Sequence, residues 1–222
     1  DSKGPVHWHT DVEFWVCNTE IELRDPKGAL SNKIGSSTYH EHNDKRIHLE
    51  GVVVDKEYDA SLEKFMAVTK GLMTDTKLVI PTNSDFVEDD IDGDQNVADR
   101  QGLSKYVREL ETGTVLEVSN GDNCAGEPAE IQAFVYSYDK QTDTYSQSKL
   151  TSPKNYVMRD ESIVPPGDCL IVEFGPRKDR TDKLCLQYGI RDKEKCGKYS
   201  GTAGGGKLCT IYERNVTSGG TQ

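Results

Sequence analysis

The first segment of the chain alternates between hydrophobic and polar positions. One parity is hydrophobic and consists of Val6, Trp8, Val12, Phe14 and Val16. The other parity is polar and consists of His7, His9, Asp11 and Glu13. Since successive side chains of a strand point to opposite faces, this pattern predicts a half-buried β-strand whose histidines face away from the core.

Further hydrophobic segments predict more strands along the chain. After a turn at Asn18-Thr19 we expect a strand over residues 20–24, and later strands in the segments 76–83, 129–139, 144–150 and 160–176. Two short strands should flank a turn at residues 43–46. Ser61 is a suitable helix N-cap and Gly71 a suitable stop, which predicts a helix between them. The sequence therefore predicts a β-rich α+β fold with a mainly antiparallel sheet and one or two short helices.

The composition changes after Pro176. Residues 177–222 are rich in Lys, Asp, Gly and Cys and include the glycine-rich spacer SGTAGGGK. We therefore expect a β-rich histidine-motif domain over residues 1–176, followed by a cysteine-containing C-terminal extension. A chain of 222 residues is long enough to bury one large core.

The cysteines indicate an oxidising compartment. Their number is even, and no CxxC spacing supports a zinc ribbon or a redox motif; they are Cys17, Cys124, Cys169, Cys185, Cys196 and Cys209. We expect disulfides to stabilise the fold. With the Asn215-Val216-Thr217 sequon and a start at Asp1 that suggests processing, this favours an extracellular, secreted or cell-surface protein.

The overall charge narrows the range of partners. A net charge of −11 argues against nucleic acid and anionic lipid, because both bind clustered Lys and Arg. No hydrophobic run reaches the roughly 18 residues that a membrane-spanning helix needs. Metal cations are the partners that this composition favours.

All five histidines lie in two short segments. His7-x-His9 and His40-x-His42 repeat one spacing, and His48-x-Glu50 follows on the matching parity. On a strand, residues i and i+2 project to the same face, so each pair presents two imidazoles together. The candidate metal ligands are His7, His9, His40, His42, His48, Glu50, Asp11 and Asp44.

Imidazole with carboxylate suits several transition metals, of which Cu(II) and Zn are favoured here. The alternative is that the histidines are exposed strand residues bonded to neighbouring acids, or a pH-responsive patch. Cys17 shares the parity of His7 and His9, which would allow a cysteine-histidine copper centre if Cys17 were not in a disulfide.

These motifs resemble those of largely uncharacterised secreted bacterial and archaeal domains. The order is HxHxD, a hairpin, a second HxHxD and then IHxE, and it is followed much later by a turn of the type NYVMRDESIVPPGD and a strand of the type LIVEFGP. The likeness covers residues 7–176 and departs from the set at Glu41-His42-Asn43, where Thr-His-Asp is usual. It implies an extracytoplasmic fold with a shared histidine site.

An acidic segment offers a second kind of cation site. Residues 88–99, EDDIDGDQNVAD, can be aligned with a twelve-position calcium loop that has Gly93 at the sharp turn. The candidate oxygen ligands are Glu88, Asp90, Asp92, Asp94, Asn96 and Asp99. The alternative is a solvated acidic loop without a specific ion.

Three functions are compatible with these features. The first is an extracellular metal-binding protein that holds Cu or Zn on a histidine-rich strand face. The second is a structural subunit of a surface layer or filament, in which metal ions bridge self-associating copies. The third is a metalloenzyme with Glu41, Glu50 or Asp44 as base, although no HExxH or GxSxG motif supports a named reaction.

Overall fold

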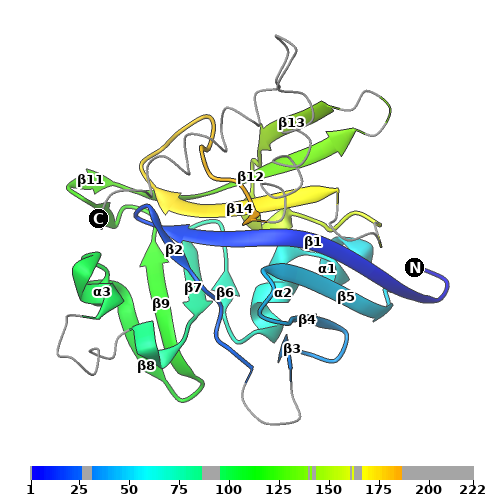
Figure 1. Cartoon of the computed structure of the whole chain (residues 1–222), viewed down its shortest axis with the longest axis horizontal. Coiled ribbons are helices and arrows are strands. Elements are labelled where there is room, and N and C mark those ends of the chain that lie inside the picture. Colours follow the sequence, from blue (N-terminus) through cyan, green and yellow to red (C-terminus); the bar gives the residue numbers. More distant parts are fainter. Residues whose placement is uncertain are drawn as a thin grey trace, which may run out of the picture.

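The computed structural model describes residues 2–26, 32–86, 96–139, 141, 144–160, 162 and 167–186. Within these ranges the chain forms two main sheets, a small hairpin and three short helices, so the predicted β-rich fold class is confirmed (Figure 1). None of the described helices has the length and hydrophobicity that crossing a bilayer requires.

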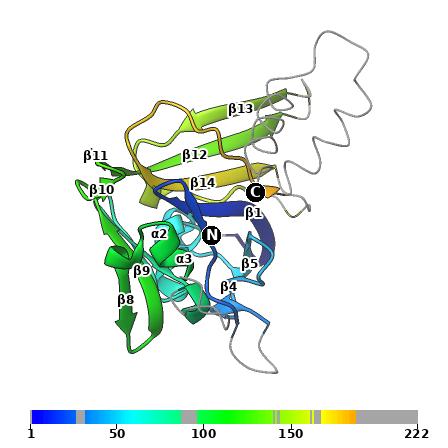
Figure 2. The same ribbon diagram turned by 60° about the vertical axis from the view of Figure 1, so that its left-hand side comes forward.

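The main sheet has eight strands in the described part of the chain. Their order is β13-β12-β14-β1-β5-β4-β3. The remaining strand, β2, pairs with the C-terminal residues of β1, Phe14 to Val16. Figures 1 and 2 show β13, β12, β14 and β1 stacked in this order. The strands are β1 (Pro5–Val16), β2 (Thr19–Ile21), β3 (Ile34–Gly35), β4 (Tyr39–Glu41), β5 (Arg46–Val52), β12 (Glu130–Asp139), β13 (Thr144–Lys149) and β14 (Asp168–Gly175). All their pairings are antiparallel except β1–β14, which is parallel.

The predicted alternation of β1 is present. Val12, Phe14 and Val16 are buried in the larger hydrophobic core, and the histidine parity faces the other side of the sheet. Cys17 and Asn18 both have positive φ, at 48° and 69°, and form a two-residue turn that places Thr19 opposite Val16. The strand predicted over residues 20–24 is therefore observed earlier and shorter, as β2.

A second sheet packs below the first in Figure 1. Its order is β6-β7-β9-β8, with β6 (Leu72–Met73), β7 (Lys77–Pro81), β8 (Val107–Leu110) and β9 (Gly113–Ser119). The hairpin of β10 (Asn123–Cys124) and β11 (Glu127–Pro128) follows β9. The Cys17–Cys124 disulfide joins this hairpin covalently to the turn after β1 of the main sheet.

The helices cover the core between the sheets. They are α1 (Lys56–Asp59), α2 (Leu62–Val68) and α3 (Val97–Arg100), with single 3₁₀ turns η1 (Ser84–Phe86), η2 (Ser104–Tyr106) and η3 (Pro153–Asn155). As predicted, the Ser61 side chain caps α2 by accepting from the Lys64 amide, at 3.1 Å. Leu62, Phe65 and Met66 face the core and are fully buried.

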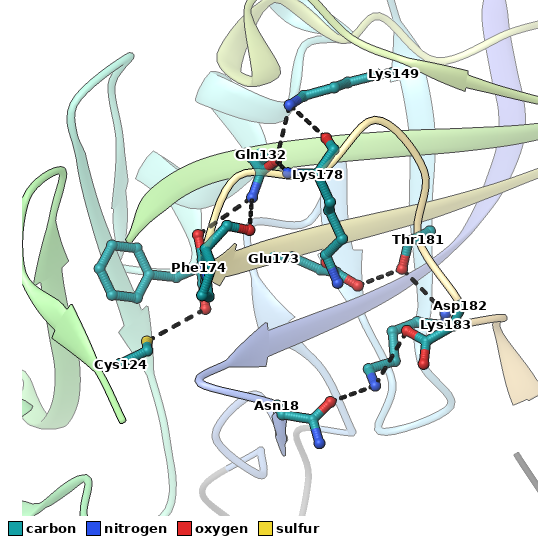
Figure 3. A network of polar contacts seen from close by, with 12 residues as sticks. Asn18, Cys124, Gln132, Lys149, Glu173, Phe174, Lys178, Thr181, Asp182 and Lys183 are labelled. Atoms are coloured by element: carbon teal, nitrogen blue, oxygen red, sulfur yellow. Dashed lines mark hydrogen bonds and ion pairs between the residues drawn. The ribbon is translucent and has the colours of Figure 1, made fainter. Parts of the chain in front are cut away.

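The outer face of β12 and β14 is covered by residues 176–186, here called the strap. Figure 3 shows how polar side chains of the sheet hold it: Gln132 accepts from the Lys178 amide at 2.9 Å, and Glu173 accepts from the Thr181 hydroxyl and pairs with the Lys178 ammonium. The Cys169–Cys185 disulfide attaches the far end of the strap to β14. The described beginning of the predicted extension thus packs on the sheet.

Glu13 of β1 lies under the strap and is buried. Its Oε1 accepts from the Leu186 amide at 2.8 Å, and its Oε2 accepts from Trp15 Nε1 at 3.1 Å. Burial, and then the neighbouring Glu20, raise the pKa of Glu13 to about 7. This carboxyl is therefore close to half-protonated at neutral pH.

Candidate metal centre

Three adjacent strands and the residue that follows β4 bring the five histidines together. β1, β5 and β4 lie side by side (Figure 1), and their register places His48 opposite both His9 and His40. One step along the sheet, His7 of β1 lies opposite Glu50 of β5. Because directly opposed residues have Cβ atoms about 4.5–5.5 Å apart, this register gathers the rings on one face.

The closest group consists of His7, His9 and His48, here called the His7 group. Each contributes one ring nitrogen, and these nitrogens all lie within 4.8 Å of one another. The Nε2 atoms of His7 and His9 are 3.1 Å apart, and the rings of His9 and His48 meet edge to face at 4.9 Å. Three imidazole nitrogens at this separation can bind one transition-metal ion.

The histidine face is not exposed, in contrast to the expectation from the alternating pattern. His9 is 5% exposed, His48 9% and His40 0%, whereas His7 remains open to solvent. The main-chain carbonyl groups of Ser162 and Asn32, from outside the three strands, contact His9 and His42. A metal ion bound by the His7 group would therefore be shielded from solvent at His9 and His48 and open to solvent at His7.

The contacts and the burial of His9 fix the tautomer and the charge state that a metal ligand needs. Its Nδ1–H donates to the Ser162 carbonyl at 3.1 Å, which leaves the lone pair on Nε2, the nitrogen that faces His7. Burial, followed by the neighbouring His48 and His7, lowers the pKa of His9 to about 4. The ring is therefore neutral at pH 7 and does not have to lose a proton before it binds a metal.

His40 and His42 form a second close pair on the opposite side of His48. Their Nε2 atoms are 3.1 Å apart, and His42 donates from Nδ1 to the Asn32 carbonyl at 2.6 Å. Burial, and then Lys33 and His42, lower the pKa of His40 to about 4. The His40 ring stacks parallel to that of His48, with centroids 5.6 Å apart.

The predicted carboxylates occupy three different positions. Glu50 contacts His7 Nε2 at 3.0 Å, and Asp44 contacts His48 Nε2 at 3.2 Å, so both border the histidines. Asp11 instead forms a buried ion pair with Arg46, at 2.8 Å. Burial raises the pKa of Asp11 to about 6 although Arg46 opposes the rise, and the carboxylate is still ionised at pH 7.

The predicted calcium loop lies mostly outside the described residues, including Glu88, Asp90, Asp92 and Asp94. Asn96 and Asp99 are described and have a structural role. The Asn96 side chain caps α3 by accepting from the Asp99 amide at 2.9 Å, and Asp99 accepts from the Ser104 hydroxyl. The Asn96 side chain is therefore a helix cap, and the Asp99 side chain binds the segment that follows α3.

Four cysteines form disulfides, Cys17–Cys124 and Cys169–Cys185, while Cys196 and Cys209 lie outside the described residues. Because a bridged sulfur cannot bind a metal, the alternative of Cys17 as a copper ligand is excluded. Disulfides of this kind are typical of proteins in oxidising, extracellular surroundings.

Sequence reasoning missed three parts of this centre: the carbonyls of Ser162 and Asn32, and the side chain of Arg46. A main-chain carbonyl that approaches from a distant loop leaves no signal in the sequence. Arg46 had a signal, since it shares the parity of His48 and follows the acidic Asp44.

Comparisons with protein-family models, with curated proteins and with solved structures found no match to this chain.

Proposed function

We propose that this chain is an extracytoplasmic metal-binding protein that holds a transition-metal ion, Cu(II) or Zn(II), through His7, His9 and His48. The observation that carries the proposal is the convergence of three imidazole nitrogens within 4.8 Å from two paired strands. The disulfides and the resemblance to secreted histidine-motif domains support a place outside the cytosol.

The donor set determines which metals are suitable. Three imidazole nitrogens match the ligands of tetrahedral zinc and of tetragonal copper, whereas Mg²⁺ and Ca²⁺ prefer oxygen. Three protein ligands leave a fourth position, which Glu50 or water can fill, since Glu50 already contacts His7. The Ser162 carbonyl would act on the metal indirectly, by fixing the orientation of the His9 ring.

Burial favours a site within one chain over a site shared between copies. Within the His7 group, His9 and His48 are buried, so a neighbouring molecule could reach only His7 directly. Metal-bridged assembly therefore has less support in this geometry than an ion held by a single chain. An enzymatic role would use the open fourth position.

Metal content after dialysis tests the proposal. The full chain, loaded separately with Zn²⁺ and Cu²⁺ and dialysed against a weak chelator, should retain metal, and His7→Ala should lower retention at this group because it removes the exposed ligand. Glu57→Ala, an exposed position on α1, is the matched control and should not change retention. Metal-free wild-type protein, or equal retention by His7→Ala, would refute the proposal.

A further inference from the structure

We propose that His40 and His42 form a second transition-metal site, separated from the His7 group by the ring of His48, with the Asp44 carboxylate in its outer shell through its contact with His48. This inference extends the proposed function and rests on it, because both sites use the same histidine face. It converts a one-ion site into a two-ion site.

The two histidine pairs are built in the same way. In each pair the Nε2 atoms are 3.1 Å apart, and in each pair one histidine donates from Nδ1 to a main-chain carbonyl, His9 to Ser162 and His42 to Asn32. Two nitrogens bound to one zinc ion at about 2.0–2.1 Å lie about 3–3.4 Å apart. The spacing of the second pair therefore fits a shared ion as well as that of the first.

The second pair also leaves buried polar atoms unpaired. His40 is fully buried, and its Nδ1 has no hydrogen-bond partner. The Oδ1 atom of Asp44 is buried and unpartnered as well, while its Oδ2 contacts His48. Because buried polar atoms in proteins are almost always paired, these two atoms show that the polar contacts around His40 and His48 are incomplete. An ion bound at the Nε2 atoms would not reach His40 Nδ1, so the 3.1 Å spacing of the Nε2 atoms is the observation that carries the second site.

Asp44 is held in place for its role in the outer shell. It lies in the turn between β4 and β5, where Asn43 and Lys45 have positive φ. The Glu41 carboxylate fixes this turn by accepting from the amides of Asp44 and Lys45, at 2.6 and 2.9 Å. The carboxylate of Asp44 would offset part of the charge of a divalent ion that two neutral imidazoles leave uncompensated.

His48 separates the two sites. It lies on the middle strand of three, between His9 on β1 and His40 on β4. The rings of His9 and His42 meet it edge to face, at 4.9 and 4.8 Å. Two divalent ions on either side of one ring repel each other, so we expect the chain to bind them in two steps of unequal affinity.

Zinc stoichiometry tests the inference in the full chain. Zn²⁺ is titrated into metal-free protein at about pH 7.5, and bound zinc is measured by equilibrium dialysis with elemental analysis. Wild type should bind two ions, while His42→Ala and His7→Ala should each bind one and the double variant none. Asp44→Asn should keep the first ion and weaken the second at least about tenfold, a typical effect of losing a carboxylate of the outer shell.

The outcomes separate this inference from the proposed function. One ion in wild type, retained in His42→Ala and lost in His7→Ala, would overturn the second site alone. One ion that either single variant abolishes would show that both pairs share a single ion, which also overturns it. One ion retained in His7→Ala and lost in His42→Ala would refute the His7 group and keep the second site. Both positions are at least partly exposed, and circular dichroism confirms that each variant folds.

Discussion

The buried carboxyl of Glu13 should make the stability of this protein fall as the pH rises. Its two oxygens accept from Leu186 in the strap and from Trp15. Glu13→Gln keeps the size of the side chain and, like the protonated acid, is uncharged and carries both an acceptor oxygen and a donor group. The variant therefore reproduces the protonated form at every pH.

The magnitude follows from the pKa of Glu13. It rises from 4.5 in a solvated chain to about 7 in the fold, so the folded state holds the proton more tightly. A raised pKa contributes stability that is complete below about pH 4.5 and is lost as the pH rises through about 7. Between about pH 5 and 8 the loss amounts to about 2.5 kcal/mol in the free energy of unfolding.

Urea unfolding at these two pH values, in the presence of a chelator, measures the effect. The difference between wild type and Glu13→Gln isolates this carboxyl, because His9, His40 and Asp11 titrate in both chains. Glu57→Gln on exposed α1 is the control and should show no such pH dependence. If the difference in unfolding free energy between wild type and Glu13→Gln is the same at both pH values, Glu13 is solvated and the reasoning fails.

Three further predictions follow from the metal centre, the disulfides and the acidic loop. Zinc at a hundredfold excess over its dissociation constant should raise the free energy of unfolding by about 2.7 kcal/mol, seen as a higher melting temperature that a chelator reverses. Replacing the Cys17–Cys124 disulfide, which spans 107 residues, with serines should lower the free energy of unfolding by about 4–5 kcal/mol, against about 3 kcal/mol for Cys169–Cys185, which spans 16. The difference is expected because a disulfide that closes a longer loop restricts the unfolded chain more. Equal urea midpoints of the two variants would contradict this reasoning. If residues 88–99 bind calcium, millimolar Ca²⁺ should raise the melting temperature of the metal-free chain, and an unchanged melting curve would count against that loop.

The local parts of the fold were predictable from sequence. The alternation in β1, the N-cap at Ser61 and the turn at residues 43–46 depend on neighbouring residues, and all are present in the structure. The strands predicted in the segments 129–139 and 144–150 also form, and they pair as the hairpin of β12 and β13. The strand β9 was not predicted. Thr114, Leu116 and Val118 share one parity and are buried, but Val115 on the other parity is hydrophobic and buried as well, which obscures the alternation.

The non-local parts of the fold and the site were not predictable in this way. Alternation identifies which face of β1 carries histidines, but not what covers that face. The Ser162 carbonyl and the strap come from the other end of the chain, and they convert an expected exposed surface into a buried one. Likewise, the spacing of the histidines predicts pairs, whereas only strand order shows that His48 lies between them.

The parallel pairing of β1 with β14 joins the first and the last described strands at the centre of the main sheet. The three histidine-bearing strands, in contrast, all lie within the first 52 residues. During synthesis the imidazoles can therefore meet long before β14 exists to close the sheet. Since contacts distant in sequence form slowly, an ion captured early could template the growing sheet, and refolding should be faster when zinc is present from the start.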